Sequence, residues 1–240
     1  MKQKVMITCP ACGLKGVREV ETRINTATQP ELKRALLQGE LQQFTCENCG
    51  AKRQIQSEMF YHDPKGKYII YNIPSLKRRY DEVEEMIDKA MQEVQEDTTD
   101  YTLRLVGLYP ELIEKSQIFD HGYDDRVVEI VKLLTDGLFA KDRPNDKVVA
   151  RYFFMHEGEP KIMYITDKDQ ILVDFNENLL KFSREKFDKI NPKPGQGHFH
   201  LVNAEWAAHA LSQSQIIHTN KAGTFEVTLK SLSLFAVIYG

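Results

Sequence analysis

The sequence predicts an α+β protein in two parts, residues 1–75 and residues 76–240. Three observations support this prediction. Two cysteine pairs lie within the first 50 residues, a helical apolar pattern runs from Leu76 to Gln95, and short β-branched and aromatic segments follow Val148. A strand-rich first part, a long connecting amphipathic helix, and a second part of helices plus an antiparallel sheet satisfy all three patterns.

The four cysteines form two pairs of identical spacing, Cys9 with Cys12 and Cys46 with Cys49, and a glycine follows each pair. This spacing lets one tight turn present two thiolates to one metal ion, and two such turns complete the tetrahedral shell that Zn²⁺ favours. The glycines suit turns that need positive φ. The pattern therefore predicts a zinc ribbon, and four protein thiolates leave no open coordination position, which indicates a structural Zn²⁺.

Disulfide or redox chemistry is the alternative interpretation of the cysteines. A Cys-Pro-Ala-Cys motif also occurs in thioredoxin-like sites, where a helix begins at the second cysteine. Here Gly13 and a strand-like stretch from Val17 to Val20 follow Cys12 instead. The local sequence therefore favours the metal over the redox interpretation.

Composition places the chain among ordinary globular proteins, with 42 % hydrophobic and 28 % charged residues. The first residues lack the apolar region of a signal peptide, and no apolar run reaches the length of a membrane span. Together with reduced cysteines, this predicts a cytoplasmic protein that does not enter membranes.

Charge is distributed unevenly. Residues 1–75 carry 11 Lys and Arg against 7 Asp and Glu, whereas residues 76–240 carry 21 against 28. Four zinc-bound thiolates would add negative charge to the first part and reduce its small basic excess further. The charge pattern therefore makes nucleic-acid binding unlikely.

The sequence of the first part predicts a ribbon with an inserted helix. Pro30 suits a first helical turn and Gly39 suits a helix end. The predicted elements, in chain order, are strands at 5–8 and 16–25, a helix from Pro30 to about Gly39, a strand at 41–45, and a hairpin of 52–59 with 68–73 that turns at 63–66.

Short motifs across residues 5–135 carry a family resemblance. They are Cys9-Pro10-Ala11-Cys12, Asn25, Pro30-Glu31-Leu32, Gly39-Glu40-Leu41, Phe44-Thr45-Cys46, Cys49-Gly50, Tyr61-His62-Asp63, Arg104-Leu105-Val106, Glu114-Lys115, Asp124-Asp125-Arg126 and Glu129-Ile130-Val131-Lys132. In these residues the chain resembles the CpXC family of bacterial and archaeal proteins. The family's second cysteine motif often contains proline, which this chain lacks, and ligation does not depend on it. The resemblance supports the predicted first domain and implies no activity.

An amphipathic helix is predicted at 76–95, because apolar residues recur there at spacings of four and three: Leu76, Tyr80, Val83, Ile87, Ala90 and Val94. The simpler interpretation is a helix docked on the chain's own core, since three heptads are short for a coiled coil. The alternative is a seam that joins two copies into a homodimer.

The second part alternates helices and strands. In chain order we expect a strand at 101–106, helices at 110–119 and from Asp124 or Asp125 to 139, a meander of strands at 148–156, 162–166 and 171–175, helices at 178–190 and 204–211, and a strand at 224–230.

Histidines in the second part form one candidate reactive cluster. His198 and His200 share one face of a predicted strand, and Glu205 and His209 lie one helical turn apart shortly afterwards. Together they could form a second metal site or an acid–base cluster. The simpler interpretation is a polar face beside a glycine-containing loop.

A second candidate cluster contains Asp124 and Asp125 with His121 and Arg126. These residue types could perform general acid–base catalysis. The simpler interpretation is an aspartate that caps a helix and an arginine that pairs with a neighbouring carboxylate.

The sequence thus favours a cytoplasmic zinc-binding protein that acts through a protein partner rather than through chemistry at the metal. The alternative is an enzyme whose site lies at one of the two C-terminal clusters. A nucleic-acid binder is the third possibility, and the charge pattern argues against it.

Overall fold

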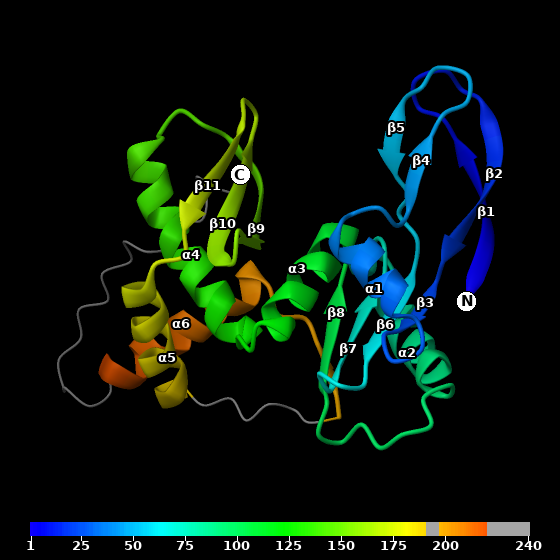
Figure 1. Ribbon diagram of the computed structural model, residues 1–240. Coiled ribbons are helices and arrows are strands. Elements are labelled where there is room, and N and C mark those ends of the chain that lie inside the picture. The colour runs from blue at the N-terminus through cyan, green and yellow to red at the C-terminus, as the bar shows by residue number, and fades with distance from the viewer. Residues whose placement is uncertain (191–196, 220–240) are drawn as a thin grey trace. The chain divides into compact units, whose positions relative to one another are not determined.

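A computed structural model describes residues 1–190 and 197–219 (Figure 1). The α+β fold class is confirmed, with the cysteines in the N-terminal region and helices plus a sheet in the C-terminal region. The described chain forms two compact units, residues 1–120 with 197–201, and residues 121–190 with 202–219. The segment 76–120, which the sequence assigned to the second part, belongs to the first unit because its strand joins the first unit's sheet.

The first unit is built on a five-stranded mixed sheet with strand order β12-β8-β7-β6-β3. Only β6 and β7 are antiparallel, and the remaining neighbours are parallel. The predicted hairpin of 52–59 with 68–73 is partly wrong. The strand that pairs with β7 is β6 at residues 59–63, whereas residues 52–54 belong to another hairpin. The strands are β3 (Arg23–Asn25), β6 (Met59–Asp63), β7 (Tyr68–Asn72), β8 (Thr102–Val106) and β12 (Phe199–His200).

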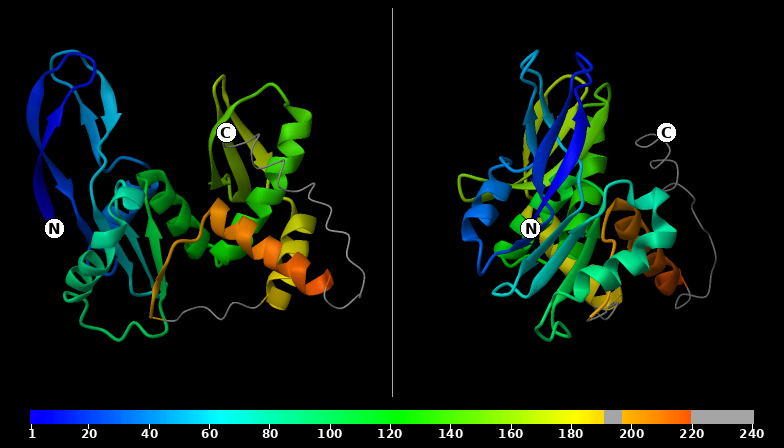
Figure 2. Two further views of the ribbon diagram at one scale, coloured as in Figure 1. Left: turned by 180° about the vertical axis from the view of Figure 1, so that it is seen from behind. Right: turned by 90° about the vertical axis from the view of Figure 1, so that its right-hand side faces the viewer.

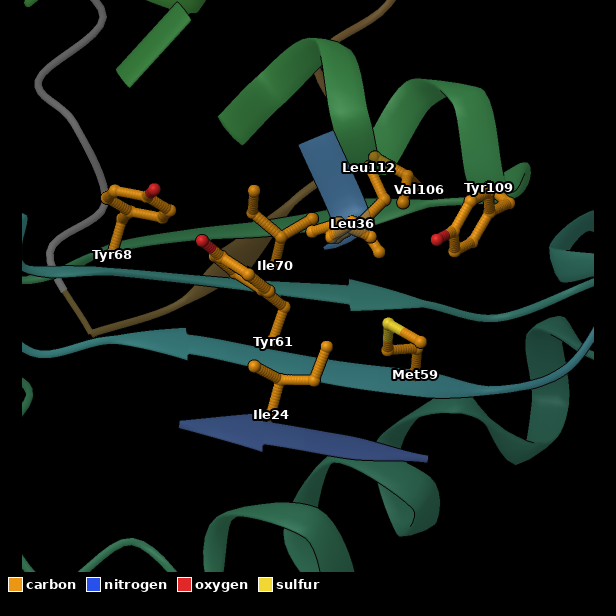
Figure 3. Close-up of a cluster of buried hydrophobic side chains, with 9 residues drawn as sticks. All are labelled: Ile24, Leu36, Met59, Tyr61, Tyr68, Ile70, Val106, Tyr109 and Leu112. Carbon is orange, nitrogen blue, oxygen red and sulfur yellow. The ribbon is translucent and has the colours of Figure 1, made fainter. Parts of the chain in front are cut away.

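One face of this sheet packs against α1 (Pro30–Leu37) and α3 (Tyr109–Asp120). Leu36 of α1 and Leu112 of α3 are fully buried against sheet residues such as Ile70. Figure 3 shows this cluster, which consists of Ile24, Leu36, Met59, Tyr61, Tyr68, Ile70, Val106, Tyr109 and Leu112. Burial of these side chains anchors both helices to the sheet.

The opposite face is covered by α2 (Val83–Met91), which lies in the connection between the parallel strands β7 and β8. Parallel neighbours need such a crossover, and a helix is its usual form. The apolar side of α2 packs against Phe60, Ile69, Tyr71, Leu103 and Leu105. Apart from Tyr80, the residues of the amphipathic stripe thus pack on this sheet of their own chain.

The predicted continuous helix at 76–95 is wrong in its extent. Two short 3₁₀ helices, η1 (Leu76–Arg78) and η2 (Tyr80–Glu82), precede α2. The backbone departs from helical geometry at Ser75, whose φ is +61°, and at Arg79, whose φ and ψ are −109° and 17°. As a result Tyr80 is 78 % exposed, although the apolar repeat includes it.

Two small antiparallel hairpins complete the first unit: β1 (Lys2–Thr8) with β2 (Lys15–Glu21), and β4 (Gln43–Thr45) with β5 (Lys52–Gln54). Their turns contain the two cysteine pairs. Figure 2 shows from two directions that the hairpins lie side by side with their turns at the same end.

The second unit contains α4 (Asp125–Asp142), the meander predicted from the sequence, and two further helices. The meander strands β9 (Val148–His156), β10 (Glu159–Thr166) and β11 (Gln170–Asp174) pair in the order β11-β10-β9. The helices α5 (Glu177–Ile190) and α6 (Ala204–Thr219) both contact α4. The strand predicted at 224–230 lies outside the described residues. None of the described helices is both long enough and apolar enough to cross a membrane.

Candidate metal centre

The two cysteine pairs sit in turns of matching geometry. In each turn the amide of the first cysteine donates to the carbonyl five residues later, at 2.8 Å for Cys9 and 2.9 Å for Cys46. The carbonyl of the same cysteine accepts from the amide of the following glycine, Gly13 at 2.8 Å or Gly50 at 2.9 Å. These glycines have φ values of 73° and 68°. Positive φ is the reason that glycine follows each pair, because a residue with a Cβ rarely adopts it.

The turns bring all four sulfurs together. The Sγ atoms of Cys9, Cys12, Cys46 and Cys49 lie within 4.8 Å of one another, and two of the distances between the pairs are 3.6 Å. Zinc–sulfur bonds of about 2.3 Å in a tetrahedron place the sulfurs about 3.8 Å apart. A disulfide would need about 2.05 Å, and all four cysteines are free. The cluster can therefore hold a metal ion, and the two 3.6 Å separations are close to those of a tetrahedral four-sulfur shell.

Without a cation, the thiols of Cys12 and Cys49 have shifted pKa values of opposite direction. The pKa of Cys12 is lowered to about 6, because the Asn48 side chain and the Leu14 amide donate to its sulfur. The pKa of Cys49 is raised to about 12, because hydrogen bonds with the other thiols and burial outweigh the lowering by the Ala51 amide. A bound divalent cation favours ionisation of all four thiols, so metal binding would release protons.

Apolar contacts around the cysteines are few. Cys9 and Cys46 are buried at 1 % and 2 % exposure, and the third buried member of their cluster is Phe44. The other two cysteines are exposed. Two of the three buried residues are thus candidate metal ligands, and the apolar residues packed against them, Ile7, Ala51 and Ile55, are only partly buried. This end of the hairpins therefore has a small core, which a bound metal ion would strengthen.

Basic residues lie near the cysteines, and one of them, Arg18, makes contacts within the protein. Its guanidinium donates to Glu47 at 2.6 Å and lies 5.4 Å from the centre of the Phe44 ring. Lys52 and Arg53 on β5 are exposed. These cations would suit the negative charge that four thiolates and one divalent ion carry together.

The candidate histidine cluster is divided between the two units. His198 and His200 belong to the first unit, where His200 is part of β12 beside β8. His209 and Glu205 lie on α6 in the second unit, and both are exposed. Across 1–190 and 197–219, the four cysteines are the one group of three or more residues placed to ligate a metal.

The aspartate cluster has the structural arrangement that the simpler interpretation predicts. Asp124 is the N-cap of α4 and accepts from the Arg126 amide at 3.0 Å. The Arg126 side chain also donates to Asp124, at 2.9 Å and 2.6 Å. Gly122 makes the preceding turn with a φ of +72°. Helix capping and an ion pair account for Asp124 and Arg126.

Sequence reasoning missed a polar network that joins four elements of the first unit, α1, β6, β7 and α3. Lys33 on α1 donates to Asp63 and to Asp120, each at 2.7 Å, and Tyr68 donates to Asp120 at 2.8 Å. The side chain of Asp63 is only 4 % exposed and also accepts from the Gly66 amide at 2.8 Å. The residues of this network are far apart in sequence. The available sequence signal was the Tyr61-His62-Asp63 motif, which does not indicate which residues contact Asp63.

The structure therefore defines a class: an α+β protein in which two β-hairpins meet at a cluster of four cysteines that could hold a metal ion. The chain belongs to the CpXC family, because the family model described as CpXC protein matches residues 7–132. The match includes both cysteine pairs and the first unit's helices. No curated protein and no solved structure matches the chain.

Proposed function

We propose that the protein is a cytoplasmic zinc-binding protein whose four-cysteine centre is structural and which acts through a protein partner. The observation that supports this proposal is the clustering of four thiol sulfurs within 4.8 Å of one another, with two separations of 3.6 Å that are close to those of a tetrahedral zinc–sulfur shell. Thiolates are soft ligands that suit Zn²⁺. With four thiolates bound, the ion has no position for water or substrate, so its role is to fix the hairpins.

A surface on the first hairpin is suited to a protein partner. Met6 on β1 is 68 % exposed, and Val17, opposite it on β2, is 50 % exposed. Leu14 in the adjacent turn is 44 % exposed. Neighbouring positions on the same face pair lysine with glutamate across the strands, as at Lys4 and Glu19. Apolar anchors with a charged rim of both signs are typical of protein interfaces.

The test is a capture experiment on lysate of the native host. Wild-type protein should retain a partner that Met6→Glu loses, because a charge at the centre of the contact removes its apolar anchor. The matched control is Leu108→Glu, which places the same charge at another exposed apolar residue of the first unit. Leu108 is 47 % exposed and is not part of the hairpin. Equal retention by both variants would rule out this surface, and retention of nothing by wild type would contradict the partner proposal.

A further inference from the structure

One edge of strand β1 points away from its neighbour β2, and the two strands form a sheet of their own. The Cys9 amide donates to the Leu14 carbonyl at 2.8 Å. At the other end of the hairpin, the Thr22 amide donates to the Met1 carbonyl, also at 2.8 Å. Hydrogen-bonded pairs alternate along an antiparallel ladder, so the odd-numbered residues of β1 direct their backbone groups toward β2. The residues that direct their N–H and C=O groups to the outer edge are therefore Lys2, Lys4, Met6 and Thr8.

The two outer edges of this hairpin differ. On β2, the Arg18 side chain donates to the outward carbonyl of Val17 at 3.0 Å. The Gln42 side chain donates in the same way to the outward carbonyl of Glu21. On β1, residues 1–190 and 197–219 provide no hydrogen-bond partner for the outward backbone groups. The outer edge of β1 can therefore accept a further strand, which is a recurring mode of peptide recognition.

The side chains along this edge determine which strand it can accept. Lys2, Lys4 and Met6 are all exposed on one face of the hairpin. Lysine on an edge strand discourages pairing with strands of like charge. Opposite charges directly across a ladder stabilise the pairing, so acidic residues suit the positions beside the two lysines. An apolar residue suits the position beside Met6.

Strand β2 already has this pattern. The register pairs opposite charges or apolar side chains across the hairpin, and the pairs are Lys2 with Glu21, Lys4 with Glu19 and Met6 with Val17. Along β2 the order is thus an apolar residue followed by acidic residues two and four positions later. A strand that adds antiparallel to the outer edge of β1 meets the same three side chains in the same order.

We propose that the outer edge of β1 binds an extended segment of a protein partner, antiparallel to β1. The segment has an apolar residue opposite Met6 and acidic residues opposite Lys4 and Lys2. Backbone hydrogen bonds provide the affinity, and the alternate side chains provide the specificity. This inference rests on the proposed function, because it defines the kind of partner that the hairpin surface accepts.

Peptide binding measured by fluorescence anisotropy tests the side-chain register. The probe is a labelled synthetic peptide that copies residues 16–22, and its charge-reversed form carries Glu19→Lys. Wild-type protein should bind the probe several-fold more tightly than the reversed peptide. Lys4→Glu should reverse this preference. The matched control Lys15→Glu makes the same charge change at an exposed residue of β2 and should keep it. No binding of the probe, or the same preference in both variants, would overturn the proposal.

Backbone pairing is tested with wild-type protein alone, so the result does not depend on how the variants fold. In the added strand the amide at the Glu19 position faces β1, whereas the amide at the Val20 position faces away. N-methylation of the probe at the first position should abolish binding, and at the second it should be tolerated. Equal effects of the two methyl groups would overturn the proposal.

Two further outcomes separate this proposal from its alternatives. A wild-type dimer, measured by light scattering, that Lys4→Glu converts to a monomer would overturn it, because a second copy would then occupy the edge. If Met6→Glu loses a captured partner while the peptides show no preference, strand addition is wrong and the proposed function stands.

Discussion

A substitution at Leu76 distinguishes two interpretations of residues 76–95: the observed crossover with a short helix, and a continuous heptad helix. Leu76 is 8 % exposed and belongs to the cluster that α2 forms with the sheet, whereas Tyr80 is 78 % exposed. A heptad seam from Leu76 to Val94 would bury both side chains. We therefore predict that Leu76→Ala destabilises the protein and that Tyr80→Ala does not.

The expected magnitudes follow from burial. Leu→Ala removes three carbons, worth about 0.8 kcal/mol each in transfer free energy, and leaves part of a cavity. Because Leu76 lies at the margin of its cluster, we expect a loss of about 2–3 kcal/mol in the free energy of unfolding. Tyr80→Ala removes a larger side chain, but from a solvated position, so we expect a change within about 0.5 kcal/mol.

Urea titration followed by circular dichroism measures both free energies, and light scattering gives the mass of each variant. The reasoning fails if Tyr80→Ala costs as much as Leu76→Ala. A wild-type dimer that Tyr80→Ala converts to a folded monomer would show instead that residues 76–95 join two copies of the chain.

Four further predictions concern the cysteine cluster, the buried network, which has two of them, and a helix cap. Cys46→Ser should lose the bound metal and the protease resistance of the two hairpins, while the α4 unit stays protected in the same digest. Lys33→Met should lower the free energy of unfolding by about 2–3 kcal/mol, because it leaves the Asp63 carboxylate buried without its cation, and an unchanged urea midpoint would contradict this. Lys33 and the Gly66 amide hold the pKa of Asp63 below its usual value, although burial acts to raise it. The stabilisation from Asp63 is therefore complete above about pH 4 and is lost as the pH falls through the folded pKa, so the stability gap between wild type and Asp63→Asn should narrow on acidification. Asp124→Ala should cost about 1 kcal/mol by removing the cap of α4, and Asp124→Ser, which restores a capping oxygen, should recover most of it.

Local signals in the sequence were sufficient to predict that the four cysteines form one cluster. The spacing of Cys9 to Cys12 and of Cys46 to Cys49, with a glycine after each pair, depends only on the geometry of one turn. The cap of α4 was predictable for the same reason, since Asp124 bonds to an amide two residues away. The meander was predictable because its strands are short apolar, β-branched and aromatic segments that the turn residues 157–160 and 167–169 separate.

Features that depend on distant pairing could not be predicted from these patterns. The parallel pairing of β7 with β8 gives no local signal, so α2 was not recognised as a crossover helix. The apolar repeat continued through Leu76 and Tyr80, but the backbone at Ser75 and Arg79 interrupts the helix there. Likewise, Lys33 and Asp120 are 87 residues apart, and only the folded sheet brings them together.

The most direct test of the zinc proposal is X-ray absorption at the zinc edge of purified protein, combined with elemental analysis. We predict one zinc per chain with four sulfur ligands at about 2.3 Å and no nitrogen or oxygen ligand. Cys12→Ser should replace one sulfur by a lighter ligand or release the ion. Absence of bound metal, iron in place of zinc, or nitrogen and oxygen ligands in the wild-type spectrum would contradict a structural four-cysteine zinc site.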